Sequence, residues 1–224
     1  LNISDAMHDL DGLGFEKDIL NRFDDMLIGG EGIILVSGPT GSGKTTTLYS
    51  TLNKMDNPDV NIVTIEDPIE YDLDNINQAQ VNRRSGVTFA SALRAILRQD
   101  PDIIMVGEVR DEETVELAIR AALTGHLVFS TIHTNDSASG FTRLLNWGME
   151  PFLITSTVKG ILSQRLVRKL CKECREKHMV EPSELIKFGL EVDEPIEFYK
   201  GVGCLSCRNT GYQGRVGLFE LIRM

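Results

Sequence analysis

Residues 38–45 read Gly-Pro-Thr-Gly-Ser-Gly-Lys-Thr, and this segment constrains the fold more than any other part of the chain. It follows the apolar run Ile33–Val36 and precedes a stretch of helical character, Thr45–Met55. A strand, a glycine-rich turn and a helix in this order form a phosphate-binding loop, whose backbone N–H groups point at phosphate oxygens. The helix adds its positive N-terminal end. We therefore expect a nucleoside triphosphate to bind here.

Each part of this loop has a physical role. The glycines allow the tight backbone curl, Lys44 supplies a cation to the β- and γ-phosphates, and the Thr45 hydroxyl can ligate Mg²⁺. The alternative, a glycine-rich turn that binds nothing, is disfavoured because every fixed position is present between the correct flanks. The predicted nucleotide-binding residues are Gly38, Pro39, Thr40, Gly41, Ser42, Gly43, Lys44, Thr45 and Thr46.

The composition limits the classes of protein to consider. The chain has 224 residues, of which 42% are hydrophobic, enough for one α/β domain with an appendage. A formal net charge of −10 makes it a poor nucleic-acid binder by bulk electrostatics. The sequence has no apolar run long enough to span a bilayer and no visible signal peptide. It begins at Leu1 rather than Met, and we expect both ends to have been cut from a longer protein.

Apolar runs and helical periodicity alternate along the first three quarters of the chain. Near-continuous apolar segments, typical of strands buried on both faces, are Gly32–Ser37, Asn61–Ile65, Asp102–Val106 and Leu127–Thr131. Helices are expected over residues 10–27, 45–55, 89–98, 111–124, 136–147 and 151–170. This alternation predicts right-handed crossovers and a mainly parallel sheet, hence an α/β fold.

Acids and a histidine follow these strands, at the edge where ligands of such sheets bind. Glu66 comes directly after the second strand, and Glu70 lies in the same loop. Glu108 and His133 each come two residues after a strand. Hydrolysis needs Mg²⁺ and a group that activates water. We assign Glu108 to the Mg²⁺ and water shell, and Glu70 is the better general-base candidate. The alternatives are helix-start or solvated acids and, for His133, a buried histidine bonded to backbone.

Two further features are interpreted as non-catalytic. His126 opens its strand and faces the opposite edge, so we expect a structural or inter-subunit role. Asn53-Lys54-Met55-Asp56 matches the guanine-specificity pattern of GTPases, but it begins nine residues after Lys44, on the phosphate-loop helix itself. That pattern normally follows a much later strand, so a guanine role is disfavoured.

All four cysteines fall in two Cys-x-x-Cys knuckles, separated by 29 residues: Cys171, Cys174, Cys204 and Cys207. Each knuckle offers two thiolates on a tight turn, and together they can form a tetrahedral zinc site. Such a site has no open position, so its role would be structural. In a cytosolic protein zinc is favoured over disulfides, and a redox pair is the alternative. His178 lies nearby but is surplus to the four sulfurs.

Five motifs therefore stand in order along the chain: Gly38–Thr46, Ile62–Glu70, Asp100–Asp111, Thr124–Thr134 and the two cysteine knuckles. With them the chain resembles the secretion/pilus motor ATPases of type II secretion and type IV pilus assembly, over nearly its whole length. The resemblance implies a RecA-like P-loop NTPase core with a mainly parallel sheet flanked by helices, plus a small zinc-binding tetracysteine subdomain. It divides the chain into four parts. Residues 1–30 are a linker or end of a missing N-terminal domain with the first helix, and residues 31–170 are the P-loop ATPase core. Residues 171–215 are the zinc-binding tetracysteine element, and residues 216–224 are the start of a truncated C-terminal segment.

The same resemblance implies a function and partners. ATP would be the substrate, Mg²⁺ and Zn²⁺ the metals, and a homohexameric ring would drive filament assembly from the cytoplasmic side of the inner membrane. An inner-membrane platform protein and the chain's own missing N-terminal domain are the implied partners, without direct nucleic-acid contact. By position, Lys44 and Thr45 bind phosphate and Mg²⁺, Glu70 activates water, Glu108 holds Mg²⁺ and water, and His133 senses the γ-phosphate. The cysteines favour the secretion and pilus-extension branch over retraction motors.

The chain departs from this family in one respect. Family members complete the site with arginines from the preceding domain, of which only linker-like residues near Leu1–Asp11 are expected here. The remaining candidates for phosphate or interface contacts, each with a solvated or salt-bridged surface as alternative, are Arg83, Arg84, Arg110 and Arg143. We therefore predict that this chain binds ATP, hydrolyses it poorly and assembles weakly.

Two other functions fit parts of the sequence. One is a motor of a nucleic-acid-uptake system, which the net charge disfavours only where the motor itself touches DNA. The other is a nucleotide-switched docking module with little turnover. Three converging acids favour catalysis over the second alternative.

Overall fold

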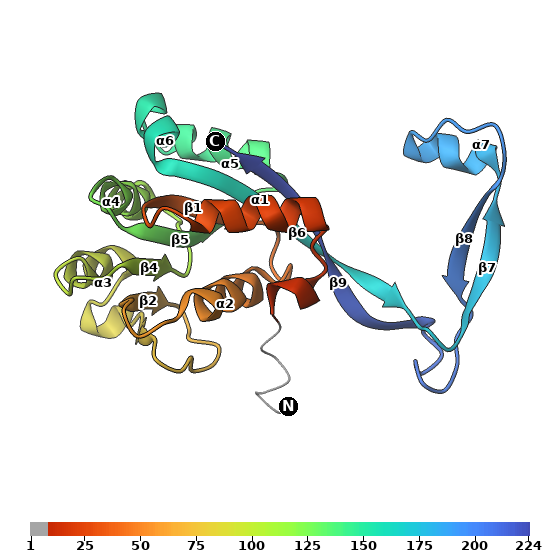
Figure 1. The fold of residues 1–224 in the computed structure, drawn as a ribbon, viewed down its shortest axis with the longest axis horizontal. Helices are drawn as coiled ribbons and strands as arrows, with labels where there is room; N and C mark the ends of the chain where they lie inside the picture. The colour runs from red at the N-terminus through yellow and green to blue at the C-terminus, as the bar shows by residue number, and fades with distance from the viewer. Residues whose placement is uncertain (1–8) are drawn as a thin grey trace. The chain divides into compact units, whose positions relative to one another are not determined.

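A computed structural model describes residues 9–224, so residues 1–8 of the predicted linker lie outside the described residues (Figure 1). The chain divides into two units. The first comprises Leu1–Leu166 and Gly217–Met224, and the second comprises Val167–Val216.

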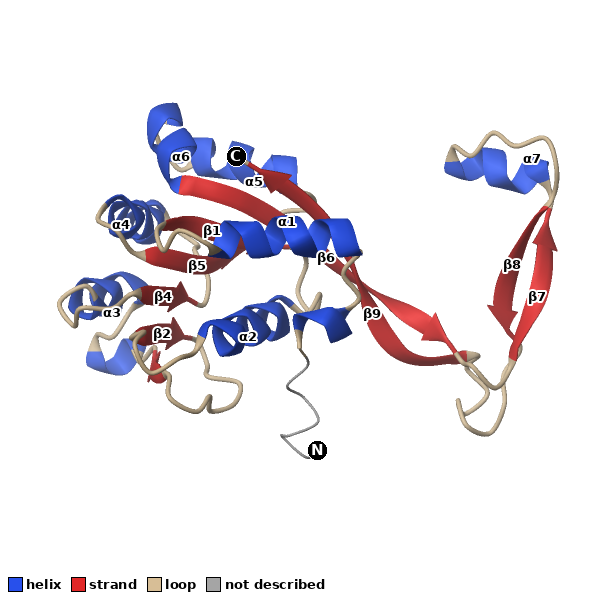
Figure 2. Cartoon of the chain, in the orientation of Figure 1, coloured by secondary structure: helices blue, strands red, loops and turns tan. Residues whose placement is uncertain are grey.

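A seven-stranded sheet in the order β3-β2-β4-β5-β1-β6-β9 forms the framework of the first unit (Figure 2). Its strands are β1 (Gly32–Ser37), β2 (Ile62–Glu66), β3 (Asn77–Gln80), β4 (Ile103–Val106), β5 (Leu127–Ile132), β6 (Val158–Leu170) and β9 (Tyr212–Arg223). The pairings from β3 across to β6 are all parallel. The predicted α/β fold with a mainly parallel sheet is confirmed, and the four strands expected from apolar runs are β1, β2, β4 and β5.

Alternate residues of the central strands point to opposite faces of the sheet and belong to two separate hydrophobic layers. Ile33 and Leu35 pack on one face with α3 (Phe89–Ile96), α4 (Glu112–Leu123), α5 (Ser137–Asn146) and α6 (Pro151–Thr157). Ile34 and Val36 pack on the other face with α1 (Lys17–Leu27) and α2 (Lys44–Met55), near the short helix η2 (Leu10–Leu13). Every residue of β1 is buried, as expected for a strand covered on both faces.

The helix boundaries follow from capping side chains. Asp111 accepts a hydrogen bond from the N–H of Thr114 at 2.8 Å, and Asp136 accepts one from Ser139 at 2.6 Å. These contacts satisfy N–H groups that a helix start leaves unpaired. α4 and α5 therefore begin where the sequence predicts.

The expectation of one helix over residues 151–170 is wrong. α6 ends at Thr157, and β6 begins at Val158 and runs along β1. A Cβ added at Gly160 would lie 2.6 Å from the Met26 Sδ and 2.7 Å from the Ile222 carbonyl oxygen, so this close approach needs glycine. The sheet therefore overrides the apparent helical period of this segment.

The second unit contains structure that the periodicity did not predict. β7 (Arg175–Val180) and β8 (Ile196–Gly201) form an antiparallel pair, joined through α7 (Pro182–Leu185) and the short helix η4 (Ile186–Phe188). Among residues 9–224, no helix combines the length and apolar character needed to cross a membrane.

Candidate active site and metal centre

The phosphate loop curls around the ammonium group of its own lysine. Lys44 is 9% exposed, and its Nζ donates to the carbonyl oxygens of Gly38 at 2.9 Å and Pro39 at 3.0 Å. Burial lowers the pKa of Lys44, while the negative charge of Glu108 acts in the opposite direction. The first turn of α2 also carries Thr45 and Thr46. The lysine is thus placed at the centre of the loop, at a helix N-terminus where a phosphate can bind.

A buried glutamine of β6, Gln164, holds the phosphate loop by hydrogen bonds. Its Nε2 donates to the Ser42 carbonyl oxygen at 2.8 Å, and its Oε1 accepts from the Thr47 hydroxyl at 2.7 Å. At Gly43, φ is +88° and an added Cβ would lie 2.8 Å from the Gln164 Nε2, so this position requires glycine. Sequence reasoning missed Gln164 because it placed this segment in a helix. The available signal was a polar residue two positions after the apolar pair Ile161 and Leu162.

One polar atom of the loop is left without a partner. Within residues 9–224, the buried side-chain oxygens that lack a hydrogen-bond partner are Ser37 Oγ and Ser42 Oγ. A buried hydroxyl without a partner is costly, and ligands commonly supply what is missing. The Ser42 hydroxyl therefore fits a loop shaped for a bound anion.

A carboxylate, a guanidinium and an imidazole meet beyond the carboxyl ends of β4 and β5. The Glu108 carboxylate lies 2.5 Å from the Arg110 Nε and 3.6 Å from the His133 Nε2. Glu108 also acts electrostatically on Lys44. Its side chain is 13% exposed, whereas that of His133 is 50% exposed, so the buried-histidine alternative does not describe His133. The structure thus brings together Glu108 and His133, and the charge of Glu108 also acts on Lys44, as expected for residues at one edge.

A hollow of about 330 Å³ lies beside Glu108 and His133 and is lined by Glu108, Val109, Arg110, His133, Arg143 and Trp147. The Arg143 guanidinium lies 4.7 Å from the centre of the Trp147 ring. The hydrogen bond that Arg110 donates to the Glu108 carboxylate raises the pKa of Arg110. Two of the four candidate arginines therefore line this hollow.

The other candidates lie elsewhere. Arg83 pairs with Asp67 at 3.6 Å, which matches the salt-bridged surface alternative, and Arg84 is exposed. The ring of His126 contacts the Ala121 carbonyl oxygen at 2.9 Å, a local bond at the start of β5. This contact agrees with a structural role for His126.

Glu66, the last residue of β2, and Glu70, in the loop that follows, differ sharply in environment. Glu66 is 3% exposed and accepts hydrogen bonds from three side chains. Glu70 is exposed, and among the described residues its carboxylate has no bonding partner. The Glu66 carboxylate is therefore bonded within the protein interior, whereas the Glu70 carboxylate is exposed and unbonded among the described residues.

The candidate magnesium ligands suit that ion. A threonine hydroxyl and a carboxylate, Thr45 and Glu108, offer only hard oxygen donors, which Mg²⁺ prefers, alongside substrate phosphates. These residues would hold the metal between the loop and the end of β4.

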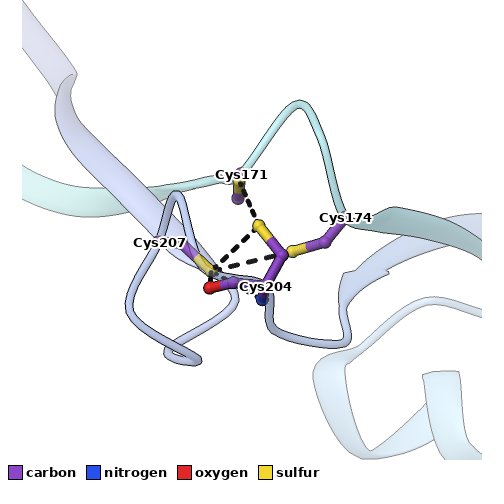
Figure 3. A group of neighbouring side chains, drawn as sticks. All are labelled: Cys171, Cys174, Cys204 and Cys207. Atoms are coloured by element: carbon purple, nitrogen blue, oxygen red, sulfur yellow. Dashed lines mark hydrogen bonds between the residues drawn. The ribbon is translucent and has the colours of Figure 1, made fainter.

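The four cysteines of the second unit form one cluster (Figure 3). Their sulfurs all lie within 4.8 Å of one another, with Sγ···Sγ distances of 3.8 Å for Cys171–Cys204 and for Cys174–Cys207. A tetrahedral site with Zn–S bonds of about 2.3 Å has sulfurs about 3.8 Å apart, whereas a disulfide joins them at about 2.05 Å. The geometry therefore fits a zinc ion and not a disulfide.

Backbone donors prepare one of these thiols for a metal. Burial acts to raise the pKa of Cys207, but the N–H groups of Cys204 and Gly211, each 3.2 Å from its Sγ, and hydrogen bonds from the Cys204 and Cys174 thiols together lower it to about 6. Burial raises the pKa of Cys174 to about 12. The cluster thus contains one thiol that readily becomes the thiolate a metal requires.

Comparison with known proteins agrees with this picture. The family model described as Type II/IV secretion system protein matches residues 1–224. The chain is 50% identical to the type II secretion system ATPase E of Vibrio cholerae, over 96% of this chain and 42% of that protein. It is also 50% identical to the type IV pilus assembly ATPase PilB of Thermus thermophilus, over 96% of this chain and 24% of that protein.

A solved structure extends the likeness to the fold. The pilus retraction motor PilT with bound ADP superposes with a TM-score of 0.65 at 36% identity, over 86% of this chain and 52% of that one. The chain spans less than half the length of the two curated relatives it matches.

Proposed function

The chain belongs to the family of type II/IV secretion system proteins, and from that membership we propose that it hydrolyses ATP as part of a motor that powers assembly of a type II secretion pseudopilus or a type IV pilus. The observation that supports this proposal most is the pairing of Glu108 with His133 beyond the ends of β4 and β5, with the charge of Glu108 acting on the phosphate-loop Lys44. The names of the two curated relatives support the same class of work.

In the proposed reaction, water attacks the γ-phosphorus while the bond to the β-phosphate oxygen breaks, releasing ADP and phosphate. Lys44 leaves the carbonyls of its loop and neutralises charge on the β- and γ-phosphates. Glu70 takes the proton of the attacking water, and His133 donates a hydrogen bond to the γ-phosphate. Mg²⁺, held by Thr45 and Glu108, would neutralise the phosphate charge and orient the oxygens.

We place this activity in a homohexameric ring on the cytoplasmic side of the inner membrane, with a membrane platform protein as partner. The domain organisation over 1–30, 31–170, 171–215 and 216–224 is proposed with it. Zinc at the four cysteines would have a structural role. Direct nucleic-acid contact is disfavoured by the net charge of −10. Arg83, one of the candidate arginines, is paired with Asp67 at 3.6 Å.

The test compares the chain with its Glu108→Gln variant, measuring Mg²⁺-dependent phosphate release from ATP at increasing protein concentration. In a ring motor, specific activity rises with concentration, because subunits complete each other's sites. Glu108→Gln should lower turnover about 100-fold or more while ATP still binds. Turnover that survives the substitution would contradict the assignment of Glu108. Binding without turnover in both proteins is expected if arginines from outside this chain complete the site, as predicted above, and also if the chain is a nucleotide-switched docking module. Repeating the comparison in a longer protein that contains those arginines separates the two, because only the motor then gains turnover.

A further inference from the structure

Tyr49 lies on α2, one helical turn beyond Thr45 in the phosphate loop, and is 1% exposed. Its hydroxyl donates to the Glu66 carboxylate at the end of β2 and accepts the backbone N–H of Glu70 at 3.4 Å. One oxygen atom therefore connects the phosphate-loop helix with the backbone of the proposed water-activating residue.

Glu66 is the fixed end of this connection. Its Oε2 accepts the Tyr49 hydroxyl, and its Oε1 accepts the Thr64 hydroxyl at 2.7 Å and the Gln78 Nε2 at 3.0 Å. A buried carboxylate with both oxygens bonded moves only by breaking hydrogen bonds in a low-dielectric interior. Glu66 therefore orients the Tyr49 hydroxyl.

The hydroxyl of Tyr49 keeps its proton and its ring keeps its place. Burial, reinforced by Glu66, raises the pKa of Tyr49 well above its usual range. The ring packs edge-to-face against Tyr71, with centroids 4.7 Å apart and an interplanar angle of 84°. The proton is thus donated to Glu66, and an oxygen lone pair is available to the N–H of Glu70.

The side chain of Glu70 has no comparable support. Its carboxylate is exposed and has no bonding partner among residues 9–224, so its position depends on its backbone. A displacement of about 1 Å from the reactive geometry can lower a rate about 100-fold. Whatever holds the Glu70 backbone therefore affects catalysis.

We infer that Tyr49 is a positioning residue whose hydroxyl holds the Glu70 backbone relative to the phosphate loop and transmits movements of α2 to Glu70. This inference rests on the proposed function, because it requires Glu70 to activate water.

The test is Tyr49→Phe, which removes the hydroxyl and keeps the ring. We expect kcat for ATP hydrolysis to fall about 10-fold or more, with ATP affinity, measured with a fluorescent ATP analogue, changed by less than about 2-fold. The matched control is Tyr71→Phe, in the loop that carries Glu70. It also removes a tyrosine hydroxyl and keeps the ring, but the Tyr71 hydroxyl makes no hydrogen bond among the described residues. It should leave kcat unchanged.

A second measurement does not depend on turnover. Hydrogen exchange of the Glu70 amide should accelerate in Tyr49→Phe and not in Tyr71→Phe, because only the first variant loses the acceptor. Addition of Mg²⁺ and a non-hydrolysable ATP analogue should change this exchange in the unmodified protein, and this response should be lost in Tyr49→Phe.

Glu70→Gln separates failure of the inference from failure of the proposed function. If Glu70→Gln retains full turnover, the water-activating role is wrong, and the inference about Tyr49 falls with it. If Glu70→Gln loses turnover while Tyr49→Phe retains kcat and unchanged amide exchange, only the inference is overturned. Parallel losses of ATP affinity and kcat in Tyr49→Phe would also overturn it, because they indicate damage to α2 as a whole.

Discussion

At the scale of single residues, Glu108 connects the charges of the candidate active site. Its ion pair with Arg110 involves a guanidinium side chain that is 57% exposed, so water weakens that pair. Its interaction with the buried Lys44 is screened much less. We therefore expect the Glu108–Arg110 ion pair to break readily when phosphate and Mg²⁺ bind. The electrostatic attraction between Glu108 and Lys44 should persist.

Gln164 provides a prediction at this scale. Gln164→Leu keeps the side-chain volume but removes the hydrogen bonds to the Ser42 carbonyl and the Thr47 hydroxyl. Leaving these buried groups unpaired should lower the free energy of unfolding by about 1–3 kcal/mol. ATP affinity should fall with it, because the loop loses its anchor.

Urea denaturation and nucleotide titration measure the two effects of Gln164→Leu. Gln99→Leu is the matched control, because the side chain of Gln99 is exposed and has no bonding partner among the described residues. Equal ATP affinity in Gln164→Leu and the unmodified chain would contradict the anchoring role.

These residues also mark how far the sequence alone could predict the site. Glu108 and His133 were predictable because parallel strands direct their carboxyl ends to one edge, so position along the chain determines position in space. Gln164 and Tyr49 were not, because their roles depend on hydrogen-bond partners that only the tertiary structure identifies. For Gln164 these partners lie 117 and 122 residues away.

At the scale of elements, fully buried strands and capped helices were predictable, and segments shaped by their neighbours were not. Asp111 and Asp136 mark helix starts through contacts within four residues, so local sequence suffices. β6 is different, since Val158–Leu162 is a strand because β1 lies beside it. β3 was missed for a related reason, because three residues of Asn77–Gln80 are polar and a single alanine gives no apolar period.

The cap of α5 gives a prediction at this scale. The N–H of Ser139 lowers the pKa of Asp136, so its stabilising effect is present above the unfolded pKa of about 4 and is lost as pH falls through the folded value. Asp136→Ala should therefore lower the melting temperature at pH 7, and the difference from the unmodified chain should shrink towards pH 3.

Thermal unfolding monitored by circular dichroism checks this pH dependence. Asp72→Ala, at an exposed acid without a hydrogen-bond partner among the described residues, should change the melting temperature little at either pH. A loss in Asp136→Ala that is the same at pH 7 and pH 3 would show that the carboxylate charge has no role in the cap.

At the scale of the molecule, the two units are stabilised by different means. The first unit has two hydrophobic layers, whereas the buried cluster of the second consists of three cysteines, Cys171, Cys174 and Cys207, with Cys204 packed against it. A two-stranded sheet is marginally stable by itself. The second unit should therefore depend on its metal far more than the first.

Zinc removal tests this difference. Treatment with a strong chelator should release about one zinc ion per chain. It should also make Val167–Val216 sensitive to protease, because the binding of a structural zinc stabilises the fold around it. ATP affinity should change by less than about 2-fold, because the phosphate loop packs within the first unit. Mass spectrometry of the fragments locates the cuts, and added zinc should restore protection. Cuts spread evenly over both units would contradict this separation.

The path of the chain between β6 and β9 has a consequence for synthesis. β9 lies beside β6 in the sheet, yet residues 171–211, most of the second unit, are made between them. At a ribosomal rate of about 5–20 residues per second, β6 waits on the order of several seconds with its outer edge unpaired, and an open edge is a template for aggregation. Zinc binding by the cysteines shortens the excursion that the returning strand must close. The supply of zinc to the nascent chain would therefore influence how much of the newly made protein reaches its folded state.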